Sequence, residues 1–175
     1  MWGLSTLESL PNPNPQDFGD TMLQPVDTGI PDEDLAVRNK LLSQKWAGLN
    51  ELPTAVLIVF VGRWSAQKGI DLIADLAPRV LHRYQNVQMI CVGPVIDLHG
   101  KLAAQKLGRV AKLFPGRLYS KPEFTAVPQH VFDACDFVLI PSRDEPFGLV
   151  AVEFGRSGAL GIGAYVGGLG SMPGW

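Results

Sequence analysis

The chain has 175 residues, of which 46% are hydrophobic and 18% are charged, and its formal net charge is -2. These values are typical of one globular domain with a full hydrophobic core, and they exclude a disordered or collagen-like chain. The slightly acidic balance argues against a nucleic-acid-binding protein, because such proteins carry a basic excess or a basic patch.

Residues 1–33 are rich in proline, asparagine, aspartate and glycine and show no sustained hydrophobic period. We interpret them as an irregular linker or surface segment and not as a signal peptide, because no apolar stretch follows a basic start. A folded domain is predicted over residues 34–175, and its first helix, capped by Asp32 or Asp34, should end near Gly48. The longest apolar run, residues 55–61, is too short to cross a bilayer, so we expect a soluble piece without a membrane segment.

Strands and helices alternate through the rest of the chain. Apolar runs predict strands over residues 55–61, 87–92, 117–119, 136–140 and 159–163. Helical spacing of apolar residues predicts helices over 68–84, 97–113, 127–134 and 148–156, the first of them kinked or divided at Pro78. This alternation predicts an α/β fold, a Rossmann-like parallel sheet with helices on both faces. Because no covering helix follows the last strand, we expect the domain to be incomplete at its C-terminus.

Two cations occupy the loop after the first predicted strand, Arg63 directly behind Gly62 and Lys68 at the start of the next helix. Parallel sheets bind ligands in the loops beyond the carboxyl ends of their strands. The free N–H groups and the dipole of a helix N-terminus favour an anion there, and the two cations add charge for phosphate oxygens. The loop therefore predicts a diphosphate site. The alternative is that both cations are solvated surface residues.

Two acids accompany the helix that is predicted after the fourth strand. Glu145 precedes Pro146, which suits a first helical turn, and Glu153 follows eight residues after Glu145. At helical rise this spacing is roughly 12 Å, which matches the reach from the transferred sugar to the ribose of a nucleotide sugar. The alternative is that both are ordinary surface acids. We expect the backbone N–H groups near this helix start to receive phosphate, and they belong to Phe147, Gly148 and Leu149.

A glycine-rich stretch, Gly161–Gly167, resembles a dinucleotide-binding fingerprint but lacks the helix and the ribose-binding acid that should follow it. We interpret it as a tight turn beside the ligand, with turn geometry alone as the alternative. A sugar-phosphate or nicotinamide enzyme would carry a glycine fingerprint after the first strand, where Arg63 and Lys68 stand instead. That class of enzyme is therefore the weaker hypothesis.

The remaining polar residues predict no metal site and no cysteine chemistry. The histidines lack acidic or cysteine partners at the spacing that metal ligands need. Asp71 and Asp75 are expected on the solvated face of their helix, and Cys91 and Cys135 are expected to be buried thiols. The three histidines are His82, His99 and His130.

Taken together, the two loops resemble a known family. Gly62-Arg-Trp-Ser-Ala-Gln-Lys-Gly is similar to the arginine–lysine loop of glycogen and starch synthases, and Pro141-Ser-Arg-Asp-Glu-Pro-Phe-Gly-Leu is similar to their Ser-Arg-x-Glu-Pro-x-Gly-Leu segment. The spacing of Glu145 and Glu153 resembles the Glu-x7-Glu motif of retaining GT-B glycosyltransferases. The two ends of the chain, from Trp2 and from Val166, are similar in particular to fungal cell-wall α-1,3-glucan synthases.

This resemblance implies the C-terminal half of a GT-B enzyme that transfers glucose from UDP-glucose, or less favourably ADP-glucose, to a growing α-glucan with retained configuration. No metal or other cofactor is implied. The implied roles are the donor diphosphate for Arg63 and Lys68, the transferred glucose for Glu145, the ribose for Glu153, and close approach of backbone amides to the donor for Gly167 and Gly168.

The resemblance also implies what surrounds the chain. The N-terminal synthase domain of the family is missing here, so the isolated piece is expected to be inactive. A whole synthase of this kind is a membrane protein, and this part would lie at the cytoplasmic face of the plasma membrane. The alternative is a non-catalytic nucleotide-sugar-binding fragment from a truncated synthase gene.

Overall fold

The structure is a computed structural model that describes residues 32–171, so the predicted linker over residues 1–33 lies almost wholly outside it. Within the described residues, none of the helices combines the length and the apolar character that a bilayer crossing requires. In chain order the elements are α1 (Asp32–Trp46), β1 (Val56–Val61), α2 (Ile70–Arg83), β2 (Val87–Val92), α3 (Leu98–Leu113), β3 (Leu118–Lys121), α4 (Gln129–Asp133), β4 (Phe137–Ile140), α5 (Leu149–Arg156), β5 (Leu160–Gly163) and α6 (Gly167–Gly170).

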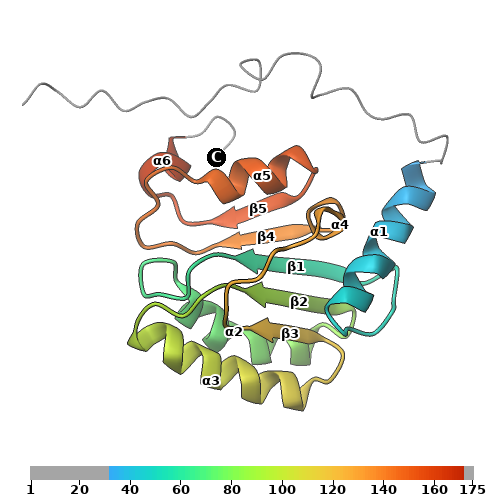
Figure 1. Cartoon of the computed structure of the whole chain (residues 1–175), viewed down its shortest axis with the longest axis horizontal. Helices are drawn as coiled ribbons and strands as arrows, with labels where there is room; N and C mark the ends of the chain where they lie inside the picture. Colours follow the sequence, from blue (N-terminus) through green and yellow to red (C-terminus); the bar gives the residue numbers. More distant parts are fainter. Residues whose placement is uncertain (1–31, 172–175) are drawn as a thin grey trace, which may run out of the picture. The chain divides into compact units, whose positions relative to one another are not determined.

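The strands form one parallel sheet of order β3-β2-β1-β4-β5. β1 and β2 pair from Val56 opposite Val87 to Val61 opposite Val92. The apolar side chains of β1 and β2 suit strands that are covered on both faces. All arrowheads in Figure 1 point the same way, so the loops that follow the strands gather at one edge of the sheet. The strand order reverses between β1 and β4, and such a switch point is where parallel sheets bind ligands.

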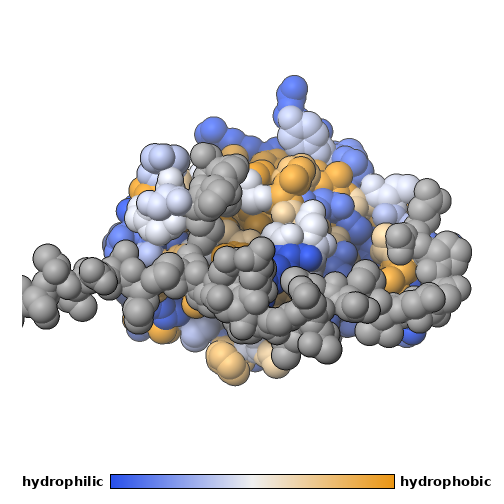
Figure 2. Space-filling view, turned by 90° about the horizontal axis from the view of Figure 1, so that it is seen from above, coloured by the Kyte–Doolittle hydropathy of each residue, from blue (hydrophilic) through white to orange (hydrophobic). Residues whose placement is uncertain are grey.

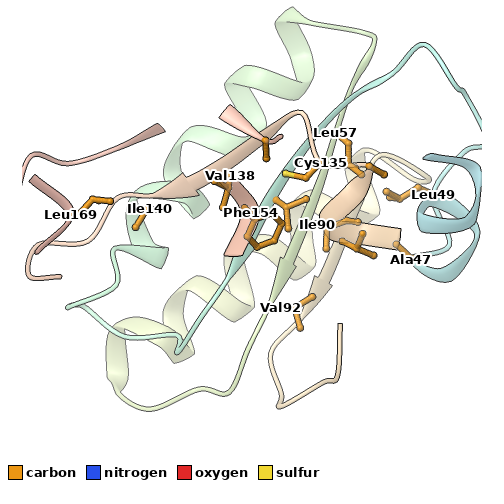
Figure 3. Packing of buried hydrophobic residues seen from close by; sticks show 14 residues of the cluster. Ala47, Leu49, Leu57, Ile90, Val92, Cys135, Val138, Ile140, Phe154 and Leu169 are labelled. Atoms are coloured by element: carbon orange, nitrogen blue, oxygen red, sulfur yellow. The ribbon is translucent and has the colours of Figure 1, made fainter. Parts of the chain in front are cut away.

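Helices cover both faces of the sheet, as predicted. On one face, α2 and α3 contribute Ile73 and Leu107 to a buried cluster with Phe60 of β1. On the other face, α5 contributes Phe154 to a second cluster, where Figure 3 shows it beside Val138 of β4. The fold is therefore the predicted α/β sandwich, with its two cores separated by the sheet.

A buried cation fastens α1 to the amino-terminal edge of the sheet. Lys40 Nζ donates a hydrogen bond to Asp136 Oδ2 and another, of 3.2 Å, to the carbonyl oxygen of Ala55. The same Asp136 oxygen accepts the N–H of Leu57 at 2.6 Å. These contacts lie where β1 and β4 begin, at the opposite end of the strands from the switch-point loops.

Two local features go beyond the predictions. Of the two outcomes predicted at Pro78, division of the helix does not occur, because α2 continues from Ile70 to Arg83 and buries Ala74, Ala77 and Leu81 on both sides of the proline. Burial of this apolar stripe offsets the one helical hydrogen bond that proline removes. After β5 the chain forms one helical turn, α6, which was not predicted, and Leu169 anchors that turn in the core.

Gly69 is the residue at which the β1–α2 loop comes closest to the end of β4. Its φ is +72°, and a Cβ added there would lie 2.1 Å from the carbonyl oxygen of Pro141. We expect Gly69→Ala to lower the free energy of unfolding by about 2–4 kcal/mol, because it adds left-handed strain and forces two backbones apart. Chemical denaturation followed by circular dichroism measures this change.

Gly108 offers the matched control for Gly69. It lies inside α3, and a Cβ added there meets nothing within 4 Å. Gly108→Ala should raise the free energy of unfolding by about 0.5–1 kcal/mol, because alanine loses less backbone entropy in a helix. Equal stability of the two variants would contradict the close approach of Gly69 to Pro141.

Candidate functional site

The loops that follow β1 and β4 lie against each other at the switch point of the sheet. The backbone N–H of Arg143 donates to the carbonyl oxygen of Gln67 at 2.8 Å, which joins the two loops directly. Gly69 packs against Pro141 in the same region. The two loops that the sequence singled out for chemistry are therefore neighbours in space.

Lys68 and Glu145 form an ion pair across these two loops. Lys68 Nζ lies 2.6 Å from Glu145 Oε2, and the side chains are 18% and 8% exposed. The hydroxyl of Ser142 donates to the same carboxylate oxygen at 2.8 Å. The backbone N–H of Gly148 donates to the other oxygen, Oε1, at 3.3 Å. The carboxylate is thus fixed by one cation and two uncharged donors at the start of α5.

These donors keep Glu145 ionised in spite of its burial. Burial alone would raise the pKa of Glu145, but the hydrogen bonds from Lys68 and Ser142, the charge of Lys68 and the N–H of Gly148 together hold that pKa below its usual value. A negatively charged Glu145 in turn holds the ammonium group of Lys68 at the mouth of the β1–α2 loop. The pair places a fixed positive charge beside the N-terminus of α5.

Arg63 stands at the exposed side of the same loop. Its Nη2 atom donates to Oε1 of Gln67 at 3.0 Å. The amide nitrogen of Gln67 is 3.4 Å from the carbonyl oxygen of Asp144, so this contact chain reaches the second loop. Arg63 follows Gly62, whose N–H donates to the carbonyl oxygen of Val92 at 3.1 Å. Arg63 and Lys68 therefore lie on one loop at one edge of the sheet, with Lys68 in the more enclosed position.

Helix α5 begins at this edge, directly behind Glu145. Gly148 precedes its first residue with a left-handed φ of 67°. Phe147 and Leu149, on either side of Gly148, are exposed, and so is Glu153 in the middle of the helix. The two predicted acids therefore differ in environment, because Glu145 is enclosed in its loop while Glu153 faces solvent farther along α5.

Gly167 and Gly168 in α6 lie against the backbone that carries Glu145. The N–H of Gly168 donates to the carbonyl oxygen of Glu145 at 2.8 Å. A Cβ at Gly167 would lie 2.4 Å from the carbonyl oxygen of Glu145, and a Cβ at Gly168 would lie 2.2 Å from that of Pro146. The sequence predicted these glycines at the ligand, and the structure shows why side chains are not tolerated there: α6 packs directly on the β4–α5 loop.

A model of the family described as glycosyl transferases group 1 matches residues 55–172, which include both loops and the whole sheet. The chain belongs to this family. The cell wall alpha-1,3-glucan synthase ags1 of Schizosaccharomyces pombe is 58% identical over 180 residues, which cover 100% of this chain and 7% of that protein. Glycogen synthase 1 of Synechocystis sp. is 34% identical over 137 residues, which cover 78% of this chain and 28% of that protein.

Solved structures of other glycosyltransferases share the fold. The catalytic domain of Starch Synthase IV from Arabidopsis thaliana, bound to ADP and acarbose, matches 78% of this chain and 27% of its own with a TM-score of 0.60 and 24% identity. Anabaena Alr3699/HepE in complex with UDP and glucose matches 80% of this chain and 38% of its own with a TM-score of 0.61 and 23% identity. The fold of the chain is therefore that of part of a GT-B glycosyltransferase domain.

The structure also shows residues at the candidate site that the sequence did not reveal. Asp71 was expected on a solvated face, and it is partly exposed there, but both of its carboxylate oxygens accept hydrogen bonds from Arg143, at 2.9 and 2.8 Å. The hydrogen bonds from Arg143 lower the pKa of Asp71. Ser142, which holds Glu145, was likewise not predicted. The signal for Ser142 and Arg143 was the Ser-Arg segment itself, to which no role was attached, whereas the local sequence around Asp71 carried no signal for this pairing.

Other features of the described residues do not suit a diphosphate. A concave pocket of about 310 Å³ lies between α2 and the ends of β4 and β5, but its lining is apolar. Burial raises the pKa of each cysteine thiol to about 12, so neither Cys91 nor Cys135 supplies a thiolate at neutral pH. Among residues 32–171, no group of three His, Cys, Asp or Glu side chains is placed to hold a metal ion.

Proposed function

We propose that this chain supplies the nucleotide-sugar-binding half of a retaining glucosyltransferase that transfers glucose from UDP-glucose to a growing α-glucan. The observation that carries the proposal is the Lys68–Glu145 pair, which places a partly enclosed ammonium group between two strand-end loops at the switch point of the sheet. The α-1,3-glucan and glycogen synthases among the relatives support the glucan product. The structural neighbours bound to ADP and acarbose and to UDP and glucose support the donor class.

The proposed diphosphate site uses the two cations and the start of α5. Lys68 meets the phosphate oxygens from the β1–α2 loop, and exposed Arg63 closes over them from the outer side of that loop. The backbone N–H of Leu149, at the positive end of the helix dipole, receives another phosphate oxygen, while the N–H of Gly148 stays on Oε1 of Glu145. As the bond between the glucose anomeric carbon and the phosphate oxygen breaks, negative charge grows on the leaving nucleotide. Fixed cations at that place stabilise the transition state.

The two carboxylates take different parts in this proposal. Glu145, held ionised at the base of the loop, keeps Lys68 in place and accepts a hydrogen bond from the transferred glucose. Glu153, exposed on α5, accepts hydrogen bonds from the ribose hydroxyls. Gly167 and Gly168 let α6 approach the donor without intervening side chains.

The acceptor and the rest of the enzyme belong to the same proposal. The chain spans 7% of the length of the α-1,3-glucan synthase ags1 and 28% of that of the cyanobacterial glycogen synthase. We propose that a second Rossmann-like domain supplies the other wall of the cleft and the acceptor groove, and that the complete synthase works at the cytoplasmic face of the plasma membrane. By this reasoning the isolated chain binds the donor but does not turn it over.

The experiment that tests the donor assignment is calorimetric titration of the 175-residue chain with UDP-glucose, ADP-glucose and UDP. We expect saturable binding of UDP-glucose and UDP, with ADP-glucose weaker by roughly tenfold or more, a difference of about 1.4 kcal/mol. Glucose 1-phosphate is the control ligand, because it lacks the nucleoside and one phosphate. Binding of neither nucleotide sugar to the folded chain would contradict the proposed function, and tighter binding of ADP-glucose would reassign the donor.

A further inference from the structure

Ala66, in the middle of the β1–α2 loop, has both of its backbone polar groups held by charged side chains from neighbouring loops. Its N–H donates to Oδ2 of Asp97 at 2.8 Å. Its carbonyl oxygen accepts from Nη1 of Arg143 at 2.6 Å. Asp97 follows β2 and Arg143 follows β4, so the β1–α2 loop is hydrogen-bonded to the loops on either side of it.

The side chains of Asp97 and Arg143 are each held in place by a second partner. Oδ1 of Asp97 accepts the N–H of Gly100 at 2.8 Å, which caps α3. The guanidinium of Arg143 forms a two-pronged pair with Asp71 of α2, and its own N–H donates to the carbonyl oxygen of Gln67 at 2.8 Å. The planar guanidinium fork fits this geometry, and a lysine ammonium group does not reproduce it.

We propose that Arg143, working with Asp97, is a positioning residue that clamps the Ala66 backbone and so places Lys68, two residues farther along, against Glu145 and the donor diphosphate. The inference rests on the proposed function, and it adds a role for the arginine of the Ser-Arg segment. Arg143 does not touch the reacting atoms in this scheme. It acts through the backbone of the β1–α2 loop, because a misplacement of about 1 Å in a charged group costs up to a hundredfold in the effect of that group.

The clamp predicts a coupling between Arg143 and Lys68 that a merely stabilising contact would not show. We would measure UDP affinity by calorimetry in a cycle of four chains: the parent, Arg143→Lys, Lys68→Ala and the double variant. Arg143→Lys keeps the charge and removes the fork. It should weaken UDP binding roughly tenfold in the parent and less than about twofold when Lys68 is already absent.

The matched control is the second ion pair on α2. Asp75 pairs with Lys106 of α3 at 2.5 Å, and both side chains are at least half exposed. Asp75→Asn should leave UDP affinity unchanged, whereas Asp71→Asn, one turn earlier, should weaken it severalfold in the parent only. Circular dichroism and thermal melting report whether each variant folds. If Arg143→Lys does not fold, Asp71→Asn replaces it in the cycle, because that variant keeps the guanidinium group but removes the charged partner that anchors it.

The outcomes separate the two proposals. If Lys68→Ala binds UDP as well as the parent does, the proposed diphosphate site is wrong and the clamp has nothing to position. If Lys68→Ala loses affinity but Arg143→Lys has the same effect in both backgrounds, or no effect in the parent, the clamp alone is overturned. If Arg143→Lys weakens UDP binding in the parent but changes it little in the Lys68→Ala background, the result supports both the diphosphate site and the clamp.

Discussion

Replacing Lys68 with alanine should lower glucosyl transfer by about 100- to 1,000-fold, because this substitution removes the most enclosed cation of the proposed diphosphate site. Losses of this size follow the removal of a single preorganised group that stabilises developing negative charge. The assay is glucose transfer from UDP-glucose by the full-length ags1 synthase of S. pombe in which this chain replaces the aligned segment, a replacement that 58% identity over the whole chain favours.

The same substitution has a second effect that the ion pair dictates. Without Lys68, the enclosed carboxylate of Glu145 loses its cation, so its pKa should rise from the lowered value of the parent. The parent pair contributes stability above the unfolded pKa of the carboxyl group and loses it as pH falls through the lowered folded pKa. We expect Lys68→Ala to be less stable than the parent by roughly 2 kcal/mol at pH 7. The difference should shrink as the pH falls from the raised pKa of Glu145 in the variant to its lowered pKa in the parent.

Two control variants separate lost chemistry from lost stability. Arg63→Ala removes an exposed cation from the same loop, so it should reduce donor affinity and transfer while leaving the free energy of unfolding within about 0.5 kcal/mol of the parent. Lys106→Ala removes an exposed cation away from the loop and should change neither quantity beyond that margin. Normal transfer rates in both Lys68→Ala and Arg63→Ala would remove this loop from the proposed site.

The sequence predicted the fold because its strongest signals are local. The runs that form β1 and β2 have apolar or β-branched residues at nearly every position, and such runs suit strands covered on both faces. Strict alternation with helices then leaves few topologies for the sheet. The meeting of the Lys68 and Glu145 loops follows from the same rule, since the carboxyl ends of parallel strands share one edge.

The contacts that hold the site together could not be predicted in the same way. Arg143 and Asp71 are 72 residues apart in the chain, and their pairing depends on the angle at which α2 leaves the loop. The local pattern around Asp71 is only that of an acid in the first turn of an amphipathic helix, which is the pattern of a solvated face. The hydrogen bonds of Asp97 and Arg143 to the backbone of Ala66 are still harder to predict from the sequence, because they involve backbone atoms that every residue type has.

The helical turn of α6 was missed for a related reason. Three of its four residues are glycine, which is a poor helix former, so propensity argues against a helix there. Tertiary packing decides the outcome, because Leu169 is fully buried and the neighbouring glycines lie on the backbone of the β4–α5 loop. A glycine-rich stretch with one leucine was therefore a packing signal for this loop.

The second large effect is expected at Glu145. Glu145→Gln keeps the shape of the side chain and removes its charge, so the hydrogen bond that Oε1 accepts from the Gly148 N–H is retained while Lys68 loses its counter-charge. We expect transfer to fall by about 100-fold or more, while UDP binds no more weakly than to the parent, because the freed ammonium group is available to the diphosphate.

Glu153→Gln is the matched substitution for Glu145→Gln, eight residues later and on the exposed side of α5. If Glu153 binds the ribose, its loss should raise the donor KM by roughly tenfold and leave kcat nearly unchanged, since this contact is the same in the ground state and the transition state. Steady-state kinetics with varied UDP-glucose distinguish the two patterns. Equal effects of the two substitutions on KM and kcat would contradict the division of roles between the two acids.

The pH dependence of glucosyl transfer gives a third, independent test of the role of Glu145. The charged groups that determine its ionisation are its own carboxylate and the facing ammonium of Lys68, with Ser142 and the Gly148 N–H as uncharged donors. Because these partners lower the pKa of Glu145, the active carboxylate form persists to a more acidic pH than is usual for a glutamate. Transfer by the parent should therefore decline only in that acid range. In Lys68→Ala the remaining activity should decline at higher pH, and in Glu145→Gln this acid limb should be absent, because no carboxyl group is left to protonate.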